Sequence, residues 1–112
     1  MEEFKATYIQ RADSIDHTPE ADVAAGDVVT IGKHCFIAKL DIPAGTLGAL
    51  ATTGVFDVAK KGDEAITAGA DLYWDAAAKG ATATAGENAP LGVAIEDAET
   101  DGATVRVLKA GV

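Results

Sequence analysis

One stretch of the chain decides the expected fold: Ile66-Thr-Ala-Gly-Ala-Asp-Leu-Tyr-Trp-Asp-Ala-Ala-Ala78, which holds the single tryptophan. Ala68-Gly69 is typical of a tight turn, because glycine adopts positive φ at little cost. Leu72-Tyr73-Trp74 predicts a short strand, since aromatic side chains fit a pleated, half-buried surface. Lys79-Gly80 is a second turn signal before a threonine-rich return over 81–85. The stretch therefore predicts a hairpin, in which Trp74 either fills the core or lies at a subunit contact.

The rest of the chain repeats this alternation of glycine turns and short apolar segments. Further strands are expected within 23–32 and at 34–40, 47–51, 55–58, 91–95 and 103–108. In the last of these, Val105 and Val107 face one way, and Thr104 and Arg106 face the other. The connections are too short for crossover helices, which favours antiparallel pairing. The predicted fold class is all-β, a small antiparallel β-barrel or sandwich with short strands.

The first residues of the chain lack the alternation of glycine turns and short apolar segments. Residues 1–22 are expected to form an extended N-terminal arm, and residues 23–112 a single β domain. Residues 4–10 alternate weakly, which is compatible with a strand of little face preference. Residues 13–20 are typical of a turn-rich connection, because Pro19 cannot continue a sheet. Such an arm either packs on another subunit or frays, and both alternatives stay open.

The sequence also contains a weak internal repeat. Val23-Ala-Ala-Gly26 corresponds to Ile66-Thr-Ala-Gly69, and Phe36-Ile-Ala-Lys-Leu-Asp41 corresponds to Gly92-Val-Ala-Ile-Glu-Asp97. Coincidence within an alanine-, glycine- and valine-rich chain is the alternative. A true repeat predicts two similar β units around one core rather than two domains.

Composition limits the classes of function. A chain of 112 residues predicts one domain, and 48% hydrophobic content with only 5% aromatic residues predicts a modest core. We therefore expect help from oligomerisation or from a host surface. A net charge of −9 argues against nucleic-acid binding. The single cysteine excludes an internal disulfide, and without a leader-like or membrane-spanning run we expect synthesis and folding in a cytoplasm.

No motif predicts catalysis or a metal site. Ser14 is the only serine and lacks a Gly-x-Ser-x-Gly elbow. His17 stands among acidic residues whose spacing matches no standard ligand set. Adjacent residues on a strand face opposite ways, so His34 and Cys35 cannot form a nucleophile–base pair, and Cys35 is expected to be a small buried side chain. The acidic turn at 96–101 lacks the order of a calcium loop. We expect no enzyme, no cofactor and no metal.

Two turn lysines raise one further alternative. Flattened barrels that carry biotin or lipoate expose a lysine on a tight hairpin, and Lys33 and Lys79 both lie in turn sequences. Neither has the flanking residues of a modified lysine, so the sequence does not favour this class.

The chain resembles a known family in a series of ordered segments. These are Tyr8-Ile-Gln10, Ile15-Asp-His-Thr-Pro19, Ala24-Ala-Gly-Asp-Val-Val29, Gly54-Val-Phe-Asp-Val58, Ala68-Gly-Ala-Asp-Leu-Tyr-Trp-Asp75, Leu91-Gly-Val-Ala94 and Ala103-Thr-Val-Arg-Val107. Over nearly its whole length the chain is similar to the small capsid cement, or head decoration, proteins of tailed bacteriophages. The sharpest element is Tyr73-Trp74-Asp75. An acidic start and Cys35, at a place where a smaller residue is common, are the departures.

The resemblance implies a structural, non-enzymatic role. Such proteins bind the outside of the phage head shell, through its major capsid protein, and stabilise it, commonly as homotrimers. The protein would then lie on the capsid surface of the virion, without nucleic acid, membrane or small-molecule substrate as partner. We expect capsid or subunit contacts at Phe4, Tyr8 and Ile9 in the arm, and at Tyr73 and Trp74. The alternative is a small β binding module, for a carbohydrate or a receptor, within a larger assembly.

Overall fold

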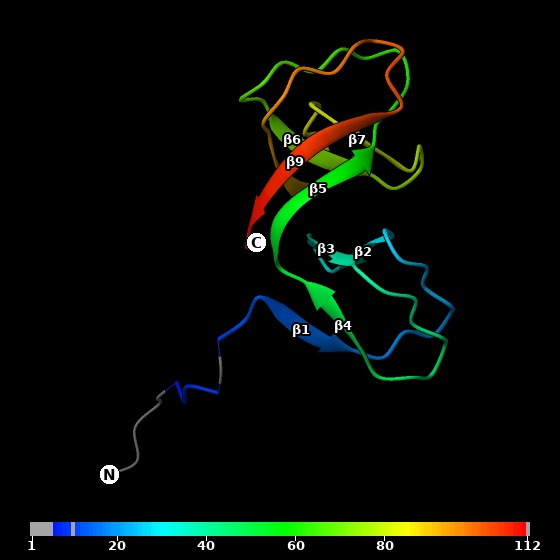
Figure 1. Ribbon diagram of the computed structural model, residues 1–112, viewed down its shortest axis with the longest axis vertical. Helices are drawn as coiled ribbons and strands as arrows, with labels where there is room; N and C mark the ends of the chain where they lie inside the picture. Colours follow the sequence, from blue (N-terminus) through cyan, green and yellow to red (C-terminus); the bar gives the residue numbers. More distant parts are fainter. Residues whose placement is uncertain (1–5, 10, 112) are drawn as a thin grey trace.

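The computed structural model describes residues 6–9 and 11–111, and this part of the chain folds into two antiparallel sheets without a helix. The strands are β1 (Ser14–His17), β2 (Val28–Ile31), β3 (His34–Ala38), β4 (Gly48–Ala51), β5 (Thr53–Ala59), β6 (Asp71–Asp75), β7 (Gly80–Thr82), β8 (Ala89–Ala94) and β9 (Thr104–Ala110). One sheet has the order β1-β4-β3-β2 and the other the order β5-β9-β8-β6-β7. Figure 1 shows the chain passing from one sheet to the other between β4 and β5. The all-β prediction is confirmed, with a sandwich-like pair of sheets.

β9 has the face pattern that its sequence predicts. Val105 and Val107 are buried, whereas Thr104, Arg106 and Leu108 are exposed. The strand pairs along its whole length with β5, from Thr53↔Ala110 to Ala59↔Thr104. A period of two along both strands therefore gives the second sheet one covered face and one open face.

The backbone hydrogen bonds confirm the internal repeat. The N–H of Gly26 donates to the carbonyl of Ala38 at 2.6 Å, and the N–H of Gly69 donates to the carbonyl of Ala94 at 2.7 Å. Both glycines have φ of +92°, a conformation that costs glycine little. The bridge Val23↔Ile42 likewise has its counterpart in Ile66↔Ala98.

The repeat extends to whole sheets. The order β1-β4-β3-β2 matches β5-β9-β8-β6, and β7 is an addition at one edge. The registers agree, because Ile15↔Leu50 and Ala38↔Leu50 in the first sheet correspond to Phe56↔Val107 and Ala94↔Val107 in the second. We call residues 14–51 unit 1 and residues 55–108 unit 2.

The two units share one core. In the main hydrophobic cluster, Cys35 and Ile37 of unit 1 pack with buried residues of unit 2 that include Leu72, Leu91 and Val107. A smaller cluster, Phe36, Ala38, Ile42 and Leu50, lies within unit 1. Unit 1 therefore covers the inner face of unit 2, as expected for two similar units around one core.

The N-terminal part differs from the expected turn. Residues 14–17 pair with β4, from Ser14↔Ala51 to His17↔Gly48, so β1 begins where a turn-rich connection is predicted. Pro19 is buried just beyond the strand end, and its carbonyl accepts the N–H of Gly45 at 2.8 Å. The turn prediction is wrong for residues 14–17, because long-range pairing outweighs local turn preference. Residues 6–9 form no strand, and Phe4 and Gln10 lie outside the described residues.

Candidate functional site

The neighbouring aromatic residues of β6, Tyr73 and Trp74, lie on opposite faces of the second sheet. Trp74 packs against the main hydrophobic cluster, as does the buried Leu72 two residues before it. Tyr73, between them, is half-buried and lines a hollow on the other face. Adjacent side chains on a strand alternate in direction, so Tyr73 and Trp74 cannot both contact a partner that binds one face of the sheet.

The hollow beside Tyr73 lies where β8 and β9 separate. The two strands pair at Val93↔Leu108 and Ala94↔Val107, and on the side of the hollow the pairing ends at Val93↔Leu108. The hollow has a volume of about 320 Å³, and its lining includes Tyr73, Val93, Leu108, Asp71, Pro90 and Ala110. We call it the outer hollow. It is mainly apolar and open, which suits an inserted side chain better than an enclosed ligand.

An apolar row continues from the outer hollow across three strands. Val55 pairs with Leu108, and Leu108 pairs with Val93. Their exposed fractions are 55%, 42% and 36% respectively. We call these three residues the outer apolar row. Exposed apolar side chains are ordinary when scattered, but a contiguous row beside a hollow is typical of an interaction surface.

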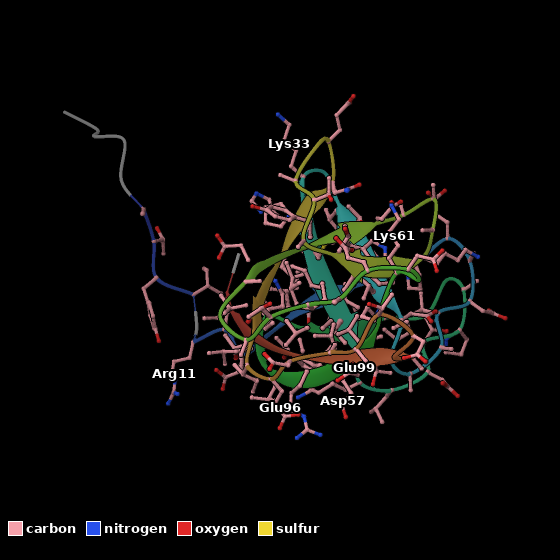
Figure 2. All side chains as sticks on the ribbon, turned by 90° about the horizontal axis from the view of Figure 1, so that it is seen from above. Arg11, Lys33, Asp57, Lys61, Glu96 and Glu99 are labelled. Atoms are coloured by element: carbon pink, nitrogen blue, oxygen red, sulfur yellow. The ribbon has the colours of Figure 1, made fainter. Side chains whose placement is uncertain are left out.

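A charged row borders the apolar one. Arg106 donates to both carboxylate oxygens of Asp57, at 2.9 and 3.1 Å, and its Nη1 lies 3.4 Å from Glu96 Oε2. The hydrogen bonds from Arg106 hold the pKa of Asp57 below its ordinary value, and those to Asp57 raise the pKa of Arg106. Figure 2 shows Asp57 and Glu96 on the same side of the molecule. This outer face thus has an apolar centre with a polar border, the arrangement of a protein–protein contact.

The N-terminal arm projects from the body. Thr52 holds its base, because the Thr52 hydroxyl donates to the Ala12 carbonyl at 2.7 Å and the Thr52 N–H donates to the Asp13 carbonyl at 2.9 Å. Beyond this anchor the chain runs outward (Figure 1), and Tyr8 and Ile9 are 79% and 80% exposed. Of the predicted contact residues, the structure therefore leaves Tyr8 and Ile9 accessible, whereas Phe4 lies outside the described residues.

Trp74 borders two further hollows between the units. One, of about 670 Å³, is lined by Trp74 with Lys33, His34 and Asn88; the other, of about 470 Å³, is lined by Trp74 with Val28 and Lys79. Trp74 thus packs on the core and still reaches the surface, so the subunit contact stays a prediction. The two turn lysines line different hollows, Lys33 the larger one and Lys79 the smaller one.

Two lysines are buried. Lys60 Nζ donates to the carbonyls of Lys61, Glu64 and Thr100, at 2.9, 2.5 and 3.0 Å, and so ties two loops together. Lys109 is 2% exposed; its Nζ donates to the Gly111 carbonyl at 2.8 Å and lies 5.5 Å from the ring centre of Phe36. Burial lowers the pKa of Lys109. Both ammonium groups are fixed by backbone carbonyls, which indicates a structural rather than a reactive role.

His34 and Cys35 differ in burial, as the alternation of side chains along a strand predicts. Cys35 is fully buried, and its pKa is raised mainly by that burial, with the charge of Lys109 opposing the shift. His34, the preceding residue, is exposed. Over residues 6–9 and 11–111, no group of three or more His, Cys, Asp or Glu is placed to hold a metal ion. The same residues include no helix long and apolar enough to cross a membrane.

The outer apolar row is the feature that the sequence analysis missed. Its one local signal is Leu108, an apolar residue on the face that also carries Thr104 and Arg106. Val55 and Val93 give no such signal, because valine occurs on both faces of short strands.

Comparison with known proteins identifies the family. The model of the phage cement protein family matches residues 9–108, which include both units. Searches of the curated proteins and of the solved structures gave no match. The matched range runs from Ile9 in the arm to Leu108 in the outer apolar row. The chain therefore belongs to the phage cement protein family, whose role is structural and associated with the capsid.

Proposed function

We propose that this protein binds the outer surface of a phage head shell, through the major capsid protein, and stabilises the shell. The observation that carries the proposal is the arm, which presents Tyr8 and Ile9 to solvent on a chain that belongs to a capsid-associated family. Within the predicted arm of residues 1–22, β1 (Ser14–His17) pairs with β4 and so forms part of the body, and we propose the residues before Asp13 as the arm that binds. The protein is made in the host cytoplasm and then resides on the virion.

The physical properties support such a role. A surface with many identical sites needs only modest affinity at each, because attachment through several linked copies multiplies the strength of binding. The net charge of −9 keeps the free protein soluble before it is attached. We propose a homotrimer as the attached form, with Phe4, Tyr8 and Ile9 of the arm and Tyr73 and Trp74 of the body in capsid or subunit contacts.

Heads that lack the protein provide the direct test. The full chain is added to expanded heads, and cryo-electron microscopy should show density on the outer shell at local three-fold positions. Decorated heads should retain their DNA to a higher temperature than bare heads. Density at other positions contradicts the trimer, and an unchanged release temperature contradicts stabilisation.

Removal of residues 1–12 tests the contribution of the arm. Shell binding should be lost, because Tyr8 and Ile9 are removed, while the body stays folded with a slightly lower melting temperature, because the Thr52 hydroxyl loses the Ala12 carbonyl. The matched control is Leu40→Ser, at an apolar residue that is 76% exposed outside the arm. That variant should bind normally. Full shell binding by the truncated chain contradicts a role for the arm.

A further inference from the structure

The repeat reveals a sheet face that is covered in one unit and open in the other. In unit 1, Val28↔Ile37 and Ile37↔Ala51 form a row across three strands, and Ile37 and Ala51 are 2% and 1% exposed. Ile37 and Val28 pack into the main hydrophobic cluster, against unit 2. This face of the repeated unit is therefore one that takes an apolar partner.

Within residues 6–9 and 11–111, nothing covers the equivalent row of unit 2. Asp71↔Val93 and Val93↔Leu108 stand at the same register positions, and the row ends at Val55. Val93, Leu108 and Val55 are the outer apolar row, all of them exposed, and the charged Asp71 stands at its end. Burying them would remove apolar surface from water at roughly 25 cal/mol per Å², which favours a partner on this face.

The N-terminal arm has the properties of that partner. Tyr8 and Ile9 are the two most exposed large apolar side chains among the described residues. An aromatic side chain on a projecting segment suits a hollow next to an apolar row. The arm also carries Arg11, and Asp71 at the rim of the outer hollow offers the opposite charge.

We propose that the arm of a second copy of this chain lies across the outer apolar row, with Tyr8 in the outer hollow beside Tyr73 and Arg11 near Asp71. The described part of the arm is directed away from its own body in both views, and Figure 2 shows Arg11 at the edge of the body, on the side where the arm leaves. Each copy gives its arm to the next and receives one on its outer face. Such a head-to-tail contact closes into a ring when the rotation between copies permits.

This inference deepens the proposed function by assigning the surface that receives the arm. It rests on the proposed homotrimer, but it is tested on the free protein, without capsid. A failure of arm exchange is thus distinguishable from a failure of shell binding. Loss of the arm would then weaken attachment by dispersing the copies, since linked copies bind a shell more strongly than single ones.

The test is a disulfide cross-link between chains that keep Tyr8 and the outer apolar row. Thr7→Cys and Ala110→Cys, the latter at an exposed residue that lines the outer hollow, are made in separate full-length chains of different tag length, mixed and oxidised. The native Cys35 is fully buried and does not compete. The matched control pairs Thr7→Cys with Leu47→Cys, at a residue that is 66% exposed in unit 1. The mixed dimer with Ala110→Cys should form roughly tenfold faster than that with Leu47→Cys, because docking raises the local concentration.

Sedimentation gives the second measurement. The wild-type chain should associate as its concentration rises, and Tyr8→Ser/Ile9→Ser should remain a monomer with an unchanged melting temperature. Three outcomes overturn the proposal. The first is equal cross-linking rates at positions 110 and 47, and the second is a wild-type chain that is monomeric at every concentration. The third is a double variant, Thr7→Cys/Ala110→Cys, whose disulfide forms only within one chain. The last outcome would place the arm on its own body.

Discussion

Asp41 and Asp97 occupy equivalent places in the two units and accept the same hydrogen bond. Asp41 Oδ1 accepts the N–H of Ala25 at 2.8 Å, and Asp97 Oδ1 accepts the N–H of Ala68 at 2.7 Å. Each carboxylate follows the end of one strand and fixes the glycine turn before another, β2 in unit 1 and β6 in unit 2. The turn that begins the central hairpin is thus held by a residue 29 positions further along the chain.

Removal of either carboxylate should loosen the turn that it holds. Asp41→Ala and Asp97→Ala should each lower the free energy of unfolding by about 1 kcal/mol, the size expected for a partly solvated hydrogen bond. Urea denaturation followed by tryptophan fluorescence measures the change. Asp101→Ala, at an exposed residue in the turn after Asp97, is the control and should be neutral. A loss at only one of the two aspartates would contradict their equivalence.

The sequence predicts those parts of the fold that depend on local pattern. The central hairpin, the alternation in β9 and the repeat of 23–26 at 66–69 all follow from turn residues and from a period of two. β1 does not, because Ser14, Asp16 and His17 have no strand pattern of their own. Its strand conformation comes from pairing with β4, more than 30 residues away along the chain. The sequence of either segment alone does not determine the register between two distant segments.

Gly92 should not tolerate a side chain. A Cβ built there would lie 2.5 Å from the Leu108 carbonyl oxygen and 2.8 Å from Val107 Cγ1, so β9 would have to move. Gly92→Ala should therefore destabilise the protein by about 2 kcal/mol. Gly62→Ala is the control, since its Cβ would meet open space, and should change stability by less than about 0.5 kcal/mol. Equal midpoints of urea denaturation for the two variants would disprove the close approach of β8 and β9.

The candidate site was predictable only in part. Tyr73 and Trp74 are conspicuous in a chain with few aromatic residues, but which of them faces the core depends on where unit 1 packs. The outer apolar row depends on the same packing, because in the described part of the chain Val93 and Leu108 are exposed where their counterparts Ile37 and Ala51 are covered. A residue's own sequence neighbourhood does not contain that information.

Lys60 should contribute far more to the free energy of unfolding than its neighbour Lys61. Lys60→Met removes the ammonium that satisfies three carbonyls and should cost about 3 kcal/mol, because the carbonyls lose their donor inside the protein. Lys61 makes an ion pair with Asp75 at 3.3 Å on a half-exposed side chain. Lys61→Met should cost less than about 1 kcal/mol. Thermal or urea unfolding of the two variants decides the question, and similar losses would contradict a structural role for Lys60.

Lys109 should make stability depend on alkaline pH. Its pKa lies below the ordinary 10.5 in the folded protein, because burial disfavours the charged form. Between the lowered pKa and 10.5 the unfolded chain binds the proton more strongly than the folded one, so the free energy of unfolding contributed by Lys109 rises with pH across that window. Lys109→Met removes this contribution.

Cys35 changes stability with pH in the direction opposite to Lys109, so both chains in the comparison must lack Cys35. Its pKa is raised above 9.0 by burial, so its contribution to stability falls as pH rises through the raised value. Cys35→Ala and Cys35→Ala/Lys109→Met are therefore compared by urea denaturation from neutral pH to pH 10.5. The chain that keeps Lys109 should gain stability relative to the double variant as pH rises. Parallel pH profiles would show that the ammonium next to Phe36 and Gly111 is as well accommodated in the core as in water.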